Sequence, residues 1–185
     1  MKVTETQLKD AVIIEPQVFG DNRGWFSETY SKKKFEEIAI FTEFVQDNAS
    51  RSATKGTVRG LHCQTQPFAQ TKLVSCTRGA VKDVIVDIRK GSPTYLKSIE
   101  VELSEDNHRM LLVPKGFLHG FVSLTDDVEL RYKVDNYYSA ENDRSVCYCD
   151  ETFGIDWGVA SPILSEKDKN APKLKDSDVE FVYEK

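Results

Sequence analysis

Two of the three histidines in this chain stand beside glycine within apolar, strand-like segments. His62 lies in the sequence Arg-Gly-Leu-His-Cys-Gln, and His119 lies in Gly-Phe-Leu-His-Gly-Phe. A cation accompanies each histidine, Arg59 in the first case and Lys115 in the second. Histidine titrates near neutral pH and therefore serves as a general acid or base. Two barrel strands that aimed both rings into one positively charged cavity would suit proton transfer on an anionic small molecule.

The histidines are also open to a plainer interpretation. His62 fits a core histidine held by one hydrogen bond, and a general base would need a carboxylate partner that no local spacing identifies. Glycine beside His119 would let the backbone approach a ligand closely. Phe117 and Phe121 share one face of that extended segment and are expected in the core. His108 lies in a polar segment and is expected on the surface.

Two cations and a tyrosine supply further groups for the same chemistry. Arg59 and Lys72, if they lie near the two histidines, would bind a diphosphate or oppose the charge of a developing enolate. Each of them taken alone fits a surface charge. Tyr132 has a functional interpretation as a general acid, but its pattern alone favours a tyrosine of the barrel wall.

The sequence lacks the ligand spacing of a metal centre. Zinc or iron would require several histidines or carboxylates at fixed spacing, and His62 is followed by neither a His-x-His pattern nor a nearby glutamate. The sequence therefore predicts no catalytic metal. The four cysteines, Cys63, Cys76, Cys147 and Cys149, include no Cys-x-x-Cys pair, and we expect free thiols.

Length and composition are typical of one soluble globular domain. The 185 residues are 39% hydrophobic and 30% charged. The net charge of −5 argues against a general binder of nucleic acid or membrane surfaces, although it allows one small basic pocket. No apolar run is long enough to cross a bilayer, and the first residues lack the apolar core of a signal peptide. We therefore expect a cytoplasmic protein with no nucleic-acid or membrane partner.

Short β-rich segments separated by turn residues predict an all-β sandwich or barrel, since closure of a sheet removes exposed edges. The mixed apolar character of Val81–Ile88 predicts a central strand covered on both faces. Lys32–Ile40 is the best helix, with Ser31 as its N-cap. The polar segment Leu164–Lys175 is expected to loop or to form a short helix. Further strands are expected at Val12–Pro16, Gly24–Tyr30, Thr71–Cys76, Ser98–Leu103, Met110–Val113, Gly120–Leu124 and Val128–Val134.

Eight segments in fixed order carry a more specific signal than any one of them. They are Phe19–Phe26, Gln46–Ser50, Gly56–His62, Gln70–Val74, Asp83–Arg89, Pro114–Phe121, Tyr132–Lys133 and Leu164–Asp168. Through these segments the chain resembles the dTDP-4-dehydrorhamnose 3,5-epimerase family over nearly its full length. The resemblance implies an all-β, mainly antiparallel fold, a cupin-type barrel or jelly roll with a few short helices. It also implies a single domain over residues 1–185, with a C-terminal tail at 164–185.

The resemblance implies acid–base chemistry on dTDP-4-dehydro-6-deoxy-D-glucose. The ketone at C4 of this sugar acidifies the hydrogens on C3 and C5. A base removes one proton, an enolate forms, and an acid returns a proton to the opposite face. By resemblance His62 is the base, Asp168 orients it, Tyr132 is the acid on the far face, and Lys72 stabilises the enolate. No metal and no redox cofactor is required.

The same matching implies the residues that bind the substrate. The family is dimeric and its N-terminal strands cross to the neighbour, which suggests that Phe26 and Glu28 serve the partner's site. Asp143 replaces the family's usual glutamate near the nucleotide, and Cys63 replaces an aromatic residue, which we expect to change packing only. The implied binding residues are Phe19, Arg23, Phe26, Glu28, Gln46, Asn48, Arg59, His119, Tyr138, Asp143 and Lys167.

Other functions remain open from the sequence. An epimerase or isomerase acting at one carbon of a related nucleotide 4-keto sugar would keep the same acid and base. A non-catalytic cupin that binds sugars would have no use for an acid and a base on opposite faces. A metal-dependent cupin oxygenase or isomerase is disfavoured by the missing His-x-His pattern.

Overall fold

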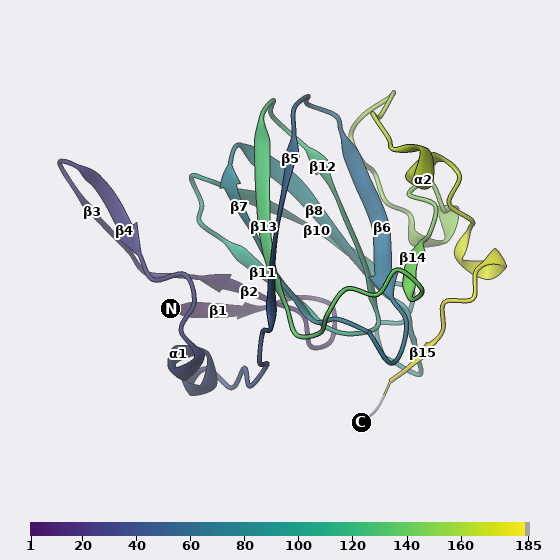
Figure 1. Cartoon of the computed structure of the whole chain (residues 1–185), viewed down its shortest axis with the longest axis horizontal. Coiled ribbons are helices and arrows are strands. Elements are labelled where there is room, and N and C mark those ends of the chain that lie inside the picture. The colour runs from purple at the N-terminus through teal and green to yellow at the C-terminus, as the bar shows by residue number, and fades with distance from the viewer. Residues whose placement is uncertain (184–185) are drawn as a thin grey trace.

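The computed structural model describes residues 1–183, which form two facing antiparallel β-sheets (Figure 1). The six-stranded sheet has the order β1-β2-β11-β7-β13-β5, and the five-stranded sheet has the order β10-β8-β12-β6-β14. This architecture confirms the expected all-β, cupin-type fold with a few short helices. Residues 184 and 185, at the end of the expected C-terminal tail, lie outside the described residues.

From β5 onward the strands mostly alternate between the two sheets, with β8 and β10 in the same one. The six-stranded sheet contains β1 (Lys2–Glu5), β2 (Val12–Glu15), β5 (Gln46–Ser52), β7 (Lys72–Arg78), β11 (Met110–Val113) and β13 (Val128–Val134). The five-stranded sheet contains β6 (Val58–Gln64), β8 (Ala80–Asp87), β10 (Ser98–Ser104), β12 (Phe117–Ser123) and β14 (Asp143–Ser145). Two smaller pairs are the β3–β4 hairpin (Val18–Asp21 and Gly24–Ser27) and the parallel pair β9 (Arg89–Lys90) and β15 (Phe181–Val182).

The helices are short. They are α1 (Lys32–Glu37), α2 (Glu166–Lys169) and the 3₁₀ turns η1 (Glu151–Phe153) and η2 (Leu174–Asp176). The predicted first helix begins after Ser31, as expected, but ends three residues early because Ala39 adopts a left-handed conformation with φ of 62°. Within residues 1–183, no helix is long and apolar enough to cross a membrane.

Apolar residues fill the space between the sheets and cover the outer face of each. Ile85 and Phe117 belong to the cluster between the sheets. Val86, the next residue of β8, belongs to a second cluster, in which residues of the C-terminal segment such as Trp157 cover the five-stranded sheet. The predicted central strand is therefore buried on both faces. Helix α1 covers part of the six-stranded sheet through the fully buried Phe35.

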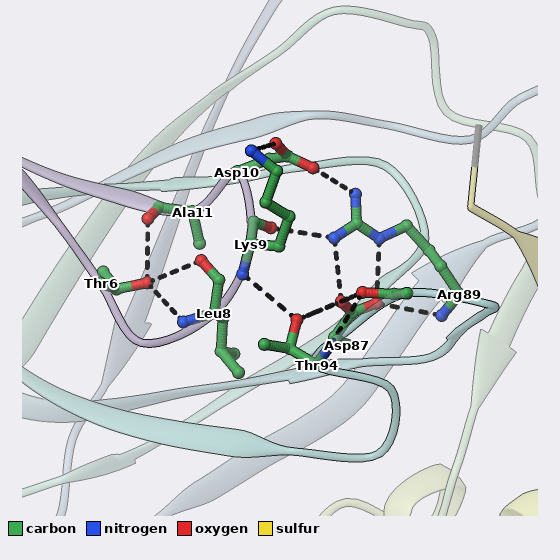
Figure 2. Close-up of polar contacts among 9 residues, drawn as sticks. Thr6, Leu8, Lys9, Asp10, Ala11, Asp87, Arg89 and Thr94 are labelled. Carbon is green, nitrogen blue, oxygen red and sulfur yellow. Dashed lines mark hydrogen bonds and ion pairs between the residues drawn. The ribbon is translucent and has the colours of Figure 1, made fainter. Parts of the chain in front are cut away.

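A buried ionic cluster ties the segment between β1 and β2 to the end of β8 (Figure 2). Arg89 donates from Nε and Nη2 to the two carboxylate oxygens of Asp87, both at 2.9 Å. It also donates from Nη1 to Asp10 Oδ2 and from Nη2 to the carbonyl of Lys9, again at 2.9 Å. Asp87 accepts a further hydrogen bond from Thr94 Oγ1 at 2.7 Å. These bonds fix the chain just before β2, which leads into the β3–β4 hairpin.

The expectation of free thiols is wrong for one pair of cysteines. Cys147 and Cys149 form a disulfide, whereas Cys63 and Cys76 are buried free thiols. Two cysteines separated by one residue would lie on one face of an extended strand, too far apart to bond. Strand β14 instead ends at Ser145, and the chain then turns, so that the two Cα atoms lie 5.1 Å apart. Cys63 packs in the apolar cluster behind the five-stranded sheet and also lines a small cavity, so an effect on packing only stays a prediction.

Candidate active site

A cavity of about 360 Å³ has walls from both sheets and from the C-terminal segment. Strands β6 and β12 contribute one wall, β7 and β13 contribute the other, and α2 with the residues before it adds a third side. The cavity brings together six of the predicted site residues, far apart in sequence: Arg59, His62, Lys72, His119, Tyr132 and Asp168.

Two glycines allow the strands that carry the histidines to approach closely. His62 on β6 and His119 on β12 are directly paired, and the pairing register then shifts between His119 and Phe121. A Cβ on Gly60 would lie 2.6 Å from the Cα of Gly120, and a Cβ on Gly120 would lie 2.7 Å from the carbonyl oxygen of Arg59. The glycine beside His119 thus serves the approach of two strands, and because Gly120 also lines the cavity, the approach of its backbone to a ligand stays a prediction.

His62 and Asp168 form a short hydrogen-bonded pair, as the family resemblance implied. The Nε2 atom of His62 lies 2.6 Å from Oδ1 of Asp168, whose side chain is only 3% exposed. Burial by itself would raise the pKa of the Asp168 carboxyl. The hydrogen bond and charge of His62, together with Ser165 and a backbone contact from Gly60, hold that pKa below its usual range. In a neutral imidazole, the ring nitrogen that donates to an ionised carboxylate carries the hydrogen. The other ring nitrogen then carries the lone pair, as a general base requires.

Tyr132 and Lys72 lie on the opposite sheet from His62. Tyr132 belongs to β13 and Lys72 to the neighbouring strand β7, while His62 belongs to β6. Burial raises the pKa of the Tyr132 hydroxyl, although Arg59 opposes the shift, so the hydroxyl keeps its proton at neutral pH. Burial lowers the pKa of the Lys72 ammonium, against the attraction of nearby acidic groups. A proton donor and a proton acceptor thus face each other across the cavity.

His119 has its own carboxylate partner, which the sequence analysis missed. Its Nε2 atom lies 2.9 Å from Oδ1 of Asp83, a fully buried residue of β8. The second oxygen of Asp83 has no hydrogen-bond partner within the described residues. The sequence carries a signal for this pair: Asp83 lies between Val81 and Ile85 on the face of β8 that points between the sheets. A carboxylate on an apolar strand face indicates a buried polar partner.

A second cavity of about 210 Å³ adjoins the first, since His62, Lys72 and Tyr132 line both. Asp143 is the centre of its polar contacts: its Oδ2 atom lies 2.5 Å from Lys167 Nζ and accepts a longer bond of 3.4 Å from the hydroxyl of Tyr138. The other predicted binding residues that line this cavity are Gln46 and Asn48. Five binding residues are thus grouped beside the acid and base.

Arg59 links the two sheets at the rim of the larger cavity. Its Nε donates to Ser52 Oγ at 3.1 Å, and its Nη2 donates to the carbonyl of Arg51 at 2.8 Å. Both acceptors belong to β5 of the opposite sheet. The guanidinium is therefore fixed by two bonds while the side of the residue that lines the cavity remains available to an anion.

Four predicted binding residues do not reach either cavity of this chain. Phe19 and Phe26 are 55% and 68% exposed on the β3–β4 hairpin, which projects away from the sheets (Figure 1). Arg23, in the turn of the hairpin, pairs with Asp21, and Glu28 pairs with Lys34 of α1 at 2.9 Å. None of the four lines the two cavities of its own chain, and their role in binding, in this site or in a partner's, stays a prediction.

The ionisable groups of the cavity are arranged for proton transfer. Within residues 1–183, no three or more histidine, cysteine, aspartate or glutamate side chains are grouped to hold a metal ion. Two histidines that line the cavity are each paired with a buried carboxylate, His62 with Asp168 and His119 with Asp83. These pairs can hold or move protons against groups on the opposite wall.

A two-sheet antiparallel barrel with a histidine–carboxylate pair facing a tyrosine defines a cupin-type isomerase. The chain belongs to the dTDP-4-dehydrorhamnose 3,5-epimerase family, whose model matches residues 5–176. It is 50% identical over 179 residues to the dTDP-4-dehydrorhamnose 3,5-epimerase of Shigella flexneri, covering 96% of this chain and 98% of that protein.

Solved structures agree with this membership. The epimerase of Bacillus anthracis with TDP and PPi bound is 53% identical, with a TM-score of 0.92 over 94% of this chain and 99% of that one. The 3,5-epimerase of Legionella pneumophila in complex with dTDP-4-keto-L-rhamnose is 45% identical, with a TM-score of 0.91 over 96% and 94%. A 3'-monoepimerase from Streptomyces bikiniensis in complex with dTDP-quinovose is more distant, at 33% identity and a TM-score of 0.85 over 92% and 86%.

Proposed function

We propose that this chain converts dTDP-4-dehydro-6-deoxy-D-glucose into dTDP-4-dehydro-L-rhamnose by inverting C3 and C5, a step of dTDP-L-rhamnose biosynthesis. One observation carries the proposal: the His62–Asp168 pair and the hydroxyl-bearing Tyr132 come from opposite sheets and line one cavity. Inversion at carbon requires a base on one face of the sugar ring and an acid on the other. This arrangement supplies both.

His62 is the base in this proposal and Tyr132 is the acid. His62 removes the proton from C3 or C5, which the C4 ketone acidifies, and the electron pair moves onto the C4 oxygen to give an enolate. The Asp168 carboxylate stabilises the imidazolium that forms. The ammonium of Lys72 opposes the charge on the C4 oxygen, and Tyr132 returns a proton to the other face of the carbon. His62 then loses its proton and Tyr132 regains one from solvent before the second inversion.

The nucleotide portion is assigned to the smaller cavity and its rim. Arg59 and Lys167 supply positive charge for the diphosphate, although Lys167 must share its charge with Asp143. The remaining polar and aromatic contacts to the nucleotide sugar are assigned to Gln46, Asn48, His119 and Tyr138. Asp143 keeps the negative charge of the family's usual glutamate on a shorter side chain.

We infer that the active form is a homodimer of single-domain chains in which the β3–β4 hairpin completes the partner's site. The supporting observation is a hairpin that exposes Phe19 and Phe26 and lies outside its own cavities. A hollow of about 420 Å³ at its base, lined by Trp25 and the half-buried His108 among others, lies on the outer face of the six-stranded sheet and offers a seat for a second chain. Arg23 and Glu28 would then act across the interface with the two phenylalanines.

The proposed compartment is the cytoplasm, where nucleotide-activated sugars are made. The Cys147–Cys149 disulfide is unusual for a reducing compartment, in which such bonds are transient or sensitive to redox state. Counting thiols by mass spectrometry after alkylation of fresh cell extract tests whether the Cys147–Cys149 pair is reduced in the cell and, with it, whether the compartment is a reducing one. Four alkylated cysteines would mean that the pair is reduced in the cell.

An epimerase that acts at one carbon is the second candidate. The similarity to a 3'-monoepimerase favours it specifically, because a single inversion needs the same base and acid. Proton NMR of the purified protein with dTDP-4-dehydro-6-deoxy-D-glucose in D₂O separates the two. Deuterium at both C3 and C5 supports the double inversion, and deuterium at one carbon supports the single inversion. A folded protein that causes no exchange would overturn both and favour a sugar-binding role.

A further inference from the structure

Ser165 occupies a special position at the start of α2. It is the N-cap of this four-residue helix, and its Oγ accepts a hydrogen bond from the backbone N–H of Asp168 at 3.1 Å. The same hydroxyl donates to Oδ2 of Asp168 at 2.9 Å. The other carboxylate oxygen, Oδ1, contacts His62. One serine hydroxyl therefore holds both the backbone and the side chain of the residue that orients the base.

We propose that Ser165 is a positioning residue for the His62–Asp168 pair, locking the Asp168 carboxylate in the orientation that His62 requires. The inference deepens the proposed epimerase function and rests on it. Ser165 also lines the larger cavity.

The geometry explains why such a lock is needed. A helix of four residues has almost no internal hydrogen bonding to hold a side chain in place, and most of its stability comes from its cap and its packing. Without the serine, the Asp168 carboxylate would keep His62 on one oxygen and the backbone contact from Gly60, and it would be freer to rotate about its terminal bond. A donor on the second oxygen removes that freedom. The fixed carboxylate then fixes the tautomer and plane of the imidazole.

The chain around α2 is held in place independently of Ser165. Before the helix, the backbone of Ile163 accepts from Val58 N at 2.9 Å and donates to the carbonyl of Gly56 at 3.0 Å. After it, the carbonyl of Pro172 accepts from Cys147 N at 2.7 Å. Loss of the Ser165 hydroxyl should therefore leave the segment docked and disturb mainly the orientation of Asp168.

The test compares three variants of the purified enzyme. Ser165→Ala removes the hydroxyl, and Ser165→Thr keeps it. Ser177→Ala is the matched control, because Ser177 donates to the carbonyl of Leu174 in the same C-terminal segment but contacts neither member of the pair. The steady-state kcat and KM for dTDP-4-dehydro-6-deoxy-D-glucose are measured alongside the melting temperature and the rate of deuterium uptake.

Ser165→Ala should lower kcat about 10-fold to 100-fold, in the range expected for a misplaced catalytic group. Its KM should change less than about 3-fold, since a lost transition-state interaction lowers kcat without weakening ground-state binding. Ser165→Thr should restore kcat to within about 3-fold, because threonine is also a capping residue. Ser177→Ala should leave kcat unchanged.

Two outcomes would overturn the inference. An unchanged kcat in Ser165→Ala would show that Asp168 is held without the serine. A fall in kcat that threonine fails to restore, or that Ser177→Ala reproduces, would reduce Ser165 to a general structural element. Either result leaves the proposed function standing, because that function is tested separately by deuterium uptake in the unmodified enzyme.

Discussion

The two buried ionic regions of this molecule differ in how completely their polar atoms are paired. At the end of β8, the Arg89 guanidinium donates two hydrogen bonds to Asp87 and a third to Asp10, and Asp87 accepts another from Thr94. Beside the cavity, by contrast, the buried Asp83 has one oxygen on His119, which lines the cavity, and its second oxygen has no hydrogen-bond partner within the described residues. Both carboxylates, Asp83 and Asp87, are fully buried residues of the same strand.

The difference separates a structural role from a catalytic one. Buried charges that are paired and hydrogen-bonded contribute rigidity, and removing one partner leaves an unpaired charge behind. Groups whose pairing is incomplete keep capacity for a ligand, and their pKa values are shifted by burial, as for Lys72 and Tyr132. The Arg89 cluster should therefore matter for stability, and the cavity groups should matter for turnover.

The strongest test on the catalytic side is His62→Ala. Removing the base should lower kcat by about 10³-fold or more, since positioned acid–base groups contribute up to about 10⁴-fold. The melting temperature should fall moderately, because the buried Asp168 carboxylate loses its histidine partner but keeps the hydrogen bond from Ser165, so turnover is measured at a temperature at which the variant is folded. Turnover and deuterium exchange are measured together, with Ser177→Ala as the control, because Ser177 lines neither cavity nor the proposed seat of the second chain. Near-normal exchange in His62→Ala would mean that another group is the base.

The strongest test on the structural side is Arg89→Met. The substitution leaves Asp87 buried without its guanidinium partner, so the free energy of unfolding should fall by about 3–5 kcal/mol. Urea denaturation measures the change. Lys90→Met is the matched control: Lys90 is the adjacent residue of β9 and forms an exposed ion pair with Glu180, which should contribute little. Equal effects of the two variants would contradict the assignment of Arg89 to a structural network.

Tyr132→Phe should separate binding from inversion. The variant keeps the ring and loses the hydroxyl, so nucleotide-sugar binding should persist while kcat falls about 10²-fold to 10³-fold. Deuterium should still exchange on the face that His62 serves, but products inverted at one or both carbons should be depleted. Tyr148→Phe, at a tyrosine that packs against Trp157, controls for loss of a hydroxyl elsewhere. Unchanged product stereochemistry and rate would remove Tyr132 from the role of acid.

Much of this architecture was predictable because strand periodicity is a local property. The bounds expected for Met110–Val113 and Val128–Val134 match β11 and β13. Family resemblance then supplied the link between His62 and Asp168, which are 106 residues apart and have no local spacing signal. The bond at 2.6 Å agrees with that implied pairing.

The features that were missed depend on tertiary contacts. The Cys147–Cys149 disulfide forms because the chain turns after β14, and that turn is not evident in the residue pattern. The Asp83–His119 pair requires β8 and β12 to be neighbours in one sheet. The role proposed for Ser165 depends on the hydrogen bond that its hydroxyl donates to the carboxylate of Asp168, which the sequence does not show. Sequence separates strands from turns well, but it does not say which side chains meet across a cavity.

The smallest expected effect concerns the pH dependence of activity through Lys72. Enolate stabilisation needs the protonated ammonium, so activity is present below the pKa of Lys72 and is lost as pH rises through it. Burial lowers that pKa, which places the alkaline limb of the pH–rate profile below the value of about 10.4 for an ordinary lysine. Burial raises the pKa of Tyr132, so its own loss of a proton falls at higher pH.

Lys72→Arg should therefore keep the charge and move the alkaline limb upward, toward the titration of Tyr132. A guanidinium remains protonated throughout the accessible range, although its different shape should lower kcat by about 10-fold. Initial rates between neutral and alkaline pH measure both effects, and Lys133→Arg on the outer face, where Lys133 pairs with Asp47, is the control. An alkaline limb that stays in place in Lys72→Arg would mean that Lys72 does not set it. The lowered pKa of Lys72 would then have no measurable effect on activity.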